Sequence, residues 1–177
     1  VDGSSDLAVF DTAAAKRYIR TVGGQAFVWN QTWGVPGSIA VPGDFNGDGK
    51  SDMATYRSAD QRWQIQSVNG GPIVQNQQWG YPGVMPTSGD FDNNGADEMA
   101  VYDPNNARWY TLAANGTIIL NGFVAGATKG QPVPGDYNGD GRTDPGVFVG
   151  GRWFAVDRGR VLAWKVNWGF SGGYPVA

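Results

Sequence analysis

The sequence predicts an all-β fold, namely a β-propeller of four blades that are each a four-stranded antiparallel sheet. Two observations support this prediction. First, the chain of 177 residues repeats one motif every 46 residues, and repeats of about 40–50 residues are typical of propeller blades. Second, short apolar runs alternate with glycine- and asparagine-rich turns throughout, and no window shows the 3.6-residue period of a helix.

Four acidic residues anchor the repeat at one position of each copy, namely Asp6, Asp52, Glu98 and Asp144. The complete copies read VPGDFNGDGKSDMATY, TSGDFDNNGADEMAVY and VPGDYNGDGRTDPGVF, and the truncated copy VDGSSDLAVF begins the chain. They divide a single domain, residues 1–177, into repeats of residues 1–38, 39–84, 85–130 and 131–173. Each repeat has the length and strand count of one propeller blade.

The predicted elements follow in the same order in every repeat. An apolar strand follows each anchor, at residues 7–10, 53–56, 99–102 and 145–148. The next strand begins with arginine and an aromatic residue, at Arg17-Tyr18, Arg62-Trp63, Arg108-Trp109 and Arg152-Trp153. A hairpin turn follows at Gly23-Gly24, Asn69-Gly70, Asn115-Gly116 and Arg158-Gly159. Because Asn-Gly readily adopts two positive φ angles, we expect type I′ turns.

The two ends of the chain indicate how a ring could close. The first repeat lacks its opening strand, whereas residues 174–177 align with the segment that leads into such a strand, residues 38–42. We expect the C-terminal strand to pair with the N-terminal blade, which would leave no open sheet edge. The alternative is that each C-terminal strand pairs with a second protomer and forms an eight-bladed homodimer. We favour the closed monomer.

The loop between the first two strands of each complete repeat predicts a metal site. Positions 1, 3, 5 and 9 carry carboxylates or amides, and a glycine at position 6 permits the sharp turn of a loop that wraps a cation. Position 7 varies freely, as expected if it provides only its carbonyl. The predicted ligands are Asp44, Asn46, Asp48, Lys50 and Asp52; Asp90, Asp92, Asn94, Ala96 and Glu98; and Asp136, Asn138, Asp140, Arg142 and Asp144. Three carboxylates in one loop repel one another without a cation, and this donor set suits Ca²⁺ better than octahedral Mg²⁺.

The loop D-x-[DN]-x-[DN]-G-x-x-[DE], followed by an apolar strand, resembles the FG-GAP/VCBS repeat. That repeat occurs in integrin α-subunit propellers, in lectins and beside catalytic domains of secreted bacterial enzymes. The resemblance covers nearly the whole chain and implies a propeller with structural calcium, but it implies no single function. The first copy departs from the pattern, because Asp2 and Asp6 match only positions 5 and 9. A fourth calcium site there is therefore doubtful.

Tryptophans are the candidate ligand-binding residues. Trp33, Trp79 and Trp168 recur at a strand end, where they form either core or the floor of a groove between blades. Trp29 and Trp164 break the repeat, since the other two blades have amides there. Each precedes a repeated tryptophan by four residues, so we expect both tryptophans of a pair on one strand face. Aromatic rings beside amides and arginines suit sugars; packing of the outer strands is the alternative.

Composition narrows the possible functions. The chain has no cysteine or histidine, which excludes disulfides, a Ser-His triad and His-ligated zinc. A net charge of −3 without basic clusters makes nucleic acid an unsuitable partner, and no apolar run is long enough for membrane insertion. We therefore predict a secreted, calcium-stabilised binding module for carbohydrate.

The leading alternative is a structural or adhesion module that binds a protein. A third possibility is a polysaccharide lyase with a tyrosine base, for which Tyr18, Tyr81, Tyr110 and Tyr174 are available. Nothing in their spacing singles out a catalytic site, and no catalytic residue is predicted.

Overall fold

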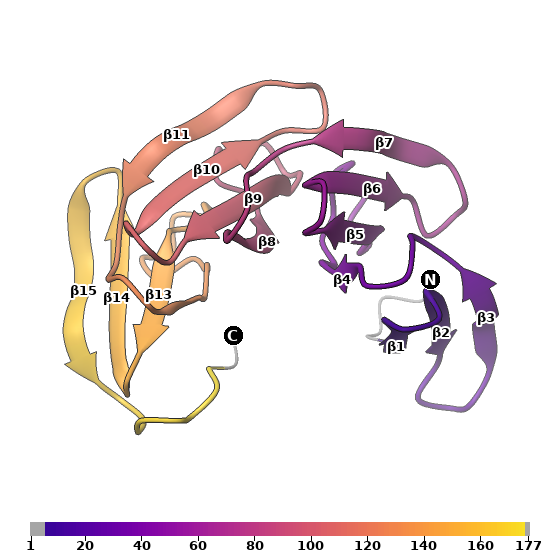
Figure 1. The fold of residues 1–177 in the computed structure, drawn as a ribbon, viewed down its shortest axis with the longest axis horizontal. Helices are drawn as coiled ribbons and strands as arrows, with labels where there is room; N and C mark the ends of the chain where they lie inside the picture. Colours follow the sequence, from indigo (N-terminus) through magenta and orange to yellow (C-terminus); the bar gives the residue numbers. More distant parts are fainter. Residues whose placement is uncertain (1–5, 176–177) are drawn as a thin grey trace.

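The computed structural model describes residues 6–175, which form four antiparallel sheets (Figure 1). As predicted, these residues contain strands and turns but no helix. None of them therefore forms a helix able to cross a membrane. Each sheet lies within one predicted repeat, so the four sheets fit the four blades expected of a propeller-like arrangement.

The sheets follow one another along the chain. The first sheet consists of β1 (Leu7–Asp11), β2 (Lys16–Arg20) and β3 (Ala26–Thr32). The second consists of β4 (Ile39–Ala40), β5 (Met53–Arg57), β6 (Arg62–Gln66) and β7 (Pro72–Gln78). The third consists of β8 (Met85–Gly89), β9 (Glu98–Asp103), β10 (Arg108–Leu112) and β11 (Ile118–Val124). The fourth consists of β12 (Gln131–Pro132), β13 (Gly146–Val149), β14 (Arg152–Asp157) and β15 (Arg160–Asn167).

The four sheets are arranged as an arc, with the last strand of each sheet on the outer side (Figure 1). Among the described residues, the first sheet has three strands and no opening strand, as predicted. Tyr174 and Pro175 form no strand and do not pair with β1. The pairing expected to close the ring is thus absent from the described residues, because the first and fourth sheets stand apart at the two ends of the arc. The rest of the expected closing strand, residues 176–177, lies outside the described part of the chain.

The hairpin turns differ from the prediction in three of the four sheets. In these three, five residues separate the paired ends of the strands, and a single glycine adopts a left-handed conformation. These glycines are Gly24, Gly70 and Gly116. In the fourth sheet Asp157 pairs directly with Arg160, and both intervening residues have positive φ. Only this two-residue loop has the geometry of a type I′ turn, because the longer loops need one left-handed residue rather than two.

The last strand of every sheet contains a β-bulge. In the first sheet Arg17 pairs with Gln31 and Ile19 pairs with Val28, so that β3 has one more residue than β2 between these pairs. A left-handed residue marks the bulge in each sheet, namely Asn30, Asn76, Gly122 and Lys165. The extra residue inverts the alternation of side chains along the strand. Residues four apart across the bulge therefore lie on opposite faces of the sheet.

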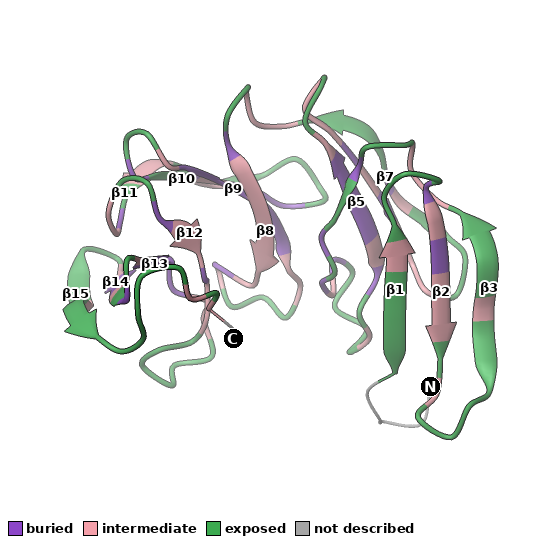
Figure 2. Ribbon diagram, turned by 60° about the horizontal axis from the view of Figure 1, so that its bottom comes forward, coloured by how far each residue is buried: buried purple, intermediate pink, exposed green. Residues whose placement is uncertain are grey.

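Apolar clusters hold neighbouring sheets together. The interface between the second and third sheets, here the second interface, contains Tyr56, Trp63, Ile65, Met99, Val101 and Leu112. The interface between the third and fourth sheets, here the third interface, contains Tyr102, Trp109, Val147, Phe154 and Val156. The interior strands β5 and β9 are accordingly buried, whereas β1, β3 and β15 at the ends of the arc are largely exposed (Figure 2).

Candidate metal loops and inter-sheet groove

The three acidic loops share one conformation, in which the position-1 carboxylate organises the backbone. Asp44 accepts hydrogen bonds from the N–H groups of Gly47, Asp48 and Gly49. Asp90 and Asp136 accept equivalent bonds within their own loops. The position-6 glycines, Gly49, Gly95 and Gly141, all have positive φ, as the sharp turn requires. In the second loop this folding brings carboxylate oxygens of Asp90, Asp92 and Glu98 within 4.8 Å of one another.

The position-9 carboxylates are buried behind the loops. One oxygen of Asp52, Glu98 and Asp144 accepts the N–H of the position-2 residue, at 2.9, 2.7 and 3.1 Å. The other oxygen of Glu98 and of Asp144 is buried without a hydrogen-bond partner. Burial raises the pKa of Asp52 and Asp144 to about 6 and that of Glu98 to about 8, and neighbouring carboxylates add to the effect. A cation would supply the missing partner for these oxygens.

The residues present fit calcium. Each loop offers three carboxylates and one amide, and hard oxygen donors of this kind suit Ca²⁺. The position-7 residues Lys50, Ala96 and Arg142 each donate a backbone N–H to the position-5 side chain, which explains why their own side chains can differ. Asp6 is exposed just before β1, and Asp2 lies outside the described residues, so the doubtful fourth site stays a prediction.

Each loop is also bonded to the loop of the neighbouring sheet. The N–H of Asp97 donates to the carbonyl of Asp44 at 2.6 Å, and the Asp97 carboxylate accepts the N–H of Asp44 at 2.9 Å. Thr143 repeats the first of these bonds, donating its N–H to the carbonyl of Asp90 at 2.7 Å. Ordering one loop therefore strengthens the attachment between two sheets.

The predicted tryptophan pair of the first sheet does not share a face. Trp29 is 72% exposed and contacts Tyr18 edge-on, with 5.3 Å between ring centroids. Trp33 lies instead under Arg17, which is on the other face of β2. The expectation of a common face is wrong because the bulge at Asn30 inverts the alternation between the two tryptophans.

The remaining predicted tryptophans are dispersed as well. Trp79 packs against the core of the second interface, and Trp164 contacts Phe154 of the fourth sheet at 5.1 Å between centroids. Trp168 is 78% exposed at the far end of the arc. The five tryptophans therefore do not form one binding site within the described structure, and only Trp33 borders a hollow.

The tyrosines considered for a lyase also do not converge. Tyr81 contacts Tyr110 edge-on and donates its O–H to Asp103 at 2.8 Å. Burial and this neighbouring carboxylate raise the pKa of Tyr81, whereas a general base requires the pKa to be lowered towards neutrality. Tyr18 belongs to β2 of the first sheet, whereas Tyr174 follows the last strand of the fourth sheet.

The pairing of β1 with β2 corrects the predicted alignment of the first repeat. Arg17 lies opposite Phe10, just as Trp63 lies opposite Tyr56 in the second sheet. The residue equivalent to Trp63 is therefore Arg17 rather than Tyr18, and the 46-residue spacing is kept. Hydrogen bonds to the bulge carbonyls agree with this register: Lys16 donates to Asn30, Arg62 to Asn76 and Arg108 to Gly122. The predicted alignment matched aromatic residues and was wrong by one position.

The interface between the first and second sheets, here the first interface, is polar where the other two are apolar. Thr55, Gln64 and Gln66 lie on the face of the second sheet opposite its buried Trp63 and Ile65. The equivalent residues are Val101, Tyr110 and Leu112 in the third sheet, and Val147, Phe154 and Val156 in the fourth. Glycines of the preceding sheet approach the first residue of each set: Gly34 approaches Thr55, Gly80 approaches Val101 and Gly126 approaches Val147. The sets therefore all face the preceding sheet.

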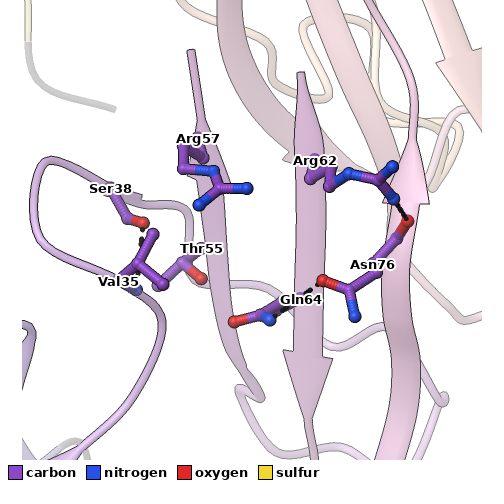
Figure 3. A pocket seen from close by; sticks show the side chains of 7 residues that line it. All are labelled: Val35, Ser38, Thr55, Arg57, Arg62, Gln64 and Asn76. Carbon is purple, nitrogen blue, oxygen red and sulfur yellow. Dashed lines mark hydrogen bonds between the residues drawn. The ribbon is translucent and has the colours of Figure 1, made fainter. Parts of the chain in front are cut away.

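Two adjoining hollows open along this polar face, and together they are here called the groove. The smaller hollow, of about 60 Å³, is lined by side chains that include Ser38, Thr55 and Arg57 (Figure 3). The larger, of about 260 Å³, is bordered by Trp33. Gln64 and Asn76 line both hollows, and the amide of Gln64 donates to that of Asn76 at 3.2 Å. Sequence reasoning missed these residues, although comparing the repeats position by position would have shown the polar set.

Arg57 and Arg62 line the smaller hollow, and Arg17 contacts the ring of Trp33, which borders the larger hollow. Arg57 and Arg62 form ion pairs with the same carboxylate, that of Asp60. Arg17 is only 5% exposed, its guanidinium lies 5.3 Å from the centre of the Trp33 ring, and two of its nitrogens have no hydrogen-bond partner. Burial lowers the pKa of Arg17. The indole nitrogen of Trp33 is likewise buried without a partner.

Comparison with known proteins supports the fold but gives no information about function. No protein-family model matches the sequence, and no curated protein matches it either. Among solved structures, the chain is similar to a protein of unknown function from Bacteroides caccae, with a TM-score of 0.52 and 14% sequence identity. The match covers 84% of this chain and 53% of that one, so the chain spans about half the length of its structural neighbour.

Proposed function

We propose that the chain is a secreted, propeller-type domain that is stabilised by calcium in its three loops and binds carbohydrate. The observation that carries the binding function is the polar first interface. Its side chains replace the apolar residues that the same scaffold uses twice elsewhere, so packing of the sheets does not require them. Polar groups between sheets destabilise the fold unless they form hydrogen bonds. Such a loss of stability is expected where the polar groups bind a ligand.

The chemistry of the groove suits a sugar. Amide and hydroxyl groups of Thr55, Gln64 and Asn76 can donate to or accept from sugar hydroxyls. Trp33 offers an aromatic wall beside them, and aromatic rings with a polar handle are favoured where one side of a ligand is apolar. The groove therefore places hydrogen-bonding groups and an aromatic ring side by side, which the other four candidate tryptophans do not.

Calcium supports this function indirectly. When bound, it would neutralise the carboxylates of each loop and satisfy the free oxygens of Glu98 and Asp144. Asp97 and Thr143 connect the loops of successive sheets, so cation binding stabilises the positions of the sheets relative to one another. For a secreted protein we expect dissociation constants of about 10⁻⁴–10⁻³ M, as in extracellular sites of this kind.

A glycan array probed with the calcium-loaded protein tests the proposal. We expect binding to at least one glycan class, weaker binding after chelation, and loss of binding in Gln64→Leu. Gln77→Leu is the matched control, since Gln77 is exposed on the same sheet and borders neither hollow. Absence of glycan binding by the folded, calcium-loaded protein would refute the carbohydrate function.

A specific observation favours assembly or adhesion as a second candidate function. Leu7 and Val9 are 53% and 65% exposed on the first sheet, whereas the equivalent Met99 and Val101 are buried in the second interface. Trp168 is exposed at the other end of the arc. The exposed apolar residues at the two ends of the arc could pack against each other. They would do so either within one closed monomer or between the two protomers of an eight-bladed ring. Light scattering distinguishes these arrangements by mass, and a stable monomer that retains exposed ends would favour an additional protein partner.

A further inference from the structure

The groove carries more positive charge than its surroundings neutralise. Arg57 and Arg62 line the smaller hollow, and Arg17 lies against Trp33 at the border of the larger one. Asp60 is the one carboxylate paired with any of these three cations in the described structure. Asp60 is half-buried and bonded to both Arg57 and Arg62, so it leaves Arg17 without a counter-ion. The second and third interfaces have uncharged side chains at the position of Arg17, namely Trp63 and Trp109, and both are fully buried.

Arg17 is the feature that scaffold packing does not explain. At the equivalent position of the second and third sheets, a tryptophan donates its indole N–H to a nearby carbonyl, as Trp63 does to Trp79. In the first sheet this neutral, satisfied side chain is replaced by a buried guanidinium that leaves two nitrogens unpartnered. A buried cation of this kind destabilises the fold unless an anion approaches it. Arg17 lies over the ring of Trp33, and that ring borders the larger hollow.

We propose, building on the carbohydrate-binding function above, that the groove selects acidic saccharides, namely those whose sugars carry a carboxylate. Arg57 and Arg62 bind the carboxylate at the mouth of the groove, while Gln64 and Asn76 bind the adjoining hydroxyls. Arg17 is a positioning residue: it supports Trp33 and adds attraction for the anion. Guanidinium groups are well suited to this role, because they bind carboxylates through charge-assisted hydrogen bonds.

Carboxyl reduction gives a matched set of probes for calorimetric titration. Oligogalacturonate, a glucuronate-containing oligosaccharide and sialyllactose are each compared with the counterpart in which –CH₂OH replaces the carboxylate. We expect at least one acidic form to bind on the order of tenfold or more tightly than its reduced form. We also expect this preference to weaken as salt is raised, since the outer arginines are partly exposed.

Arginine variants locate the interaction. Arg62→Gln and Arg108→Gln remove the same hydrogen bond to a bulge carbonyl in two different sheets, but only Arg62 borders the groove. We expect Arg62→Gln and Arg57→Gln to weaken acidic saccharide binding several-fold and Arg108→Gln to leave it unchanged. Arg17→Met should weaken binding while raising the melting temperature, because it removes a buried unpaired charge. That opposite pair of effects cannot arise from misfolding.

The outcomes separate this inference from the function on which it rests. Equal binding of acidic and reduced forms, or binding of neutral glycans alone, would overturn acidic selectivity and leave carbohydrate binding intact. Acidic binding that is unaffected by Arg57→Gln and Arg62→Gln would overturn the groove as its location. No binding to any glycan would overturn both proposals.

Discussion

The first interface and the second interface use the same backbone positions for different chemistry. In the second interface, Val101 and Leu112 of the third sheet pack against the second sheet and are nearly or fully buried. In the first interface the corresponding face carries Thr55 and glutamines beside two hollows. The strand pairing and the bulge are the same in both sheets. The two faces therefore differ in their side chains, and the sheets differ besides in the opening strand, which has two residues in β4 and five in β8.

This comparison separates what the scaffold needs from what it can vary. An apolar interface removes hydrocarbon from water and stabilises the fold by about 25 cal/mol per Å² of buried apolar area. The first interface buries less apolar area and is therefore less stabilising. It has hydrogen-bond donors, hydrogen-bond acceptors and cations around a hollow instead. A local departure from the packing pattern of the repeats thus identifies a candidate site.

The largest expected effect comes from removing a core aromatic of the apolar interfaces. Trp109 is fully buried, packs against Phe91 and Tyr102, and donates its indole N–H to Ala125. Trp109→Ala should lower the free energy of unfolding by about 3–5 kcal/mol, measured by urea denaturation with calcium present. Gln64→Leu, in the first interface, should change it by less than about 1 kcal/mol. Similar losses in the two variants would contradict the distinction between the interfaces.

Calcium removal should have the next largest effect. Each site contributes RT ln(1 + [Ca²⁺]/Kd), which at millimolar calcium and the affinities given above is on the order of 0.4–1.4 kcal/mol. Chelation should therefore lower the melting temperature reversibly. Asp140→Ala, in the loop of the fourth sheet, should remove part of the gain. An unchanged melting temperature in chelator, together with no calcium by elemental analysis, would refute the metal sites.

Most of the fold could be predicted from the sequence because the repeat carries redundant signals. Each anchor is followed by an apolar strand, and the ends of all four observed strands lie within one residue of the expected ranges. Closure could not be inferred in the same way, since it depends on the curvature that successive interfaces impose on the arc. Hairpin geometry was missed because loop length, rather than the Asn-Gly pair alone, decides the turn type.

The acidic loops were recognisable because their carboxylates and amides are close together in the sequence. The groove was not, because Trp33 and Gln64 come from different sheets and no local motif connects them. Matching the aromatic residues of the repeats did not reveal the groove either. That alignment placed Tyr18 at the position of the core tryptophans, where the structure has Arg17. A bulge, which no propensity signals, then placed Trp29 and Trp33 on opposite faces.

The pH dependence of stability should change sign with calcium. Without the cation, the folded-state pKa values of Asp52 and Asp144, about 6, and of Glu98, about 8, exceed those of the unfolded chain, near 4. Their contribution is present below pH 4 and is lost as pH rises through 6 and 8. Calcium-free protein should therefore melt at a higher temperature at pH 5 than at pH 8. With calcium the order should reverse, because cation binding requires the ionised carboxylates. A calcium-free protein that becomes more stable with rising pH would contradict this assignment.

Exchanging one residue between the two interfaces tests the comparison at a single position. Thr55 and Val101 occupy the same position in consecutive sheets, and both are buried. Val101→Thr places a hydroxyl in the apolar second interface and should lower the free energy of unfolding by about 1–3 kcal/mol. Thr55→Val restores the repeat pattern in the first interface and should raise it, by no more than about 1 kcal/mol, while weakening saccharide binding. Urea denaturation of both variants, with calcium present, measures the two changes. Because the substitutions are the reverse of each other, side-chain volume and β-propensity are nearly matched, and only the surroundings differ. Changes of equal sign would show that the polar first interface is simply a tolerated variant of the apolar one.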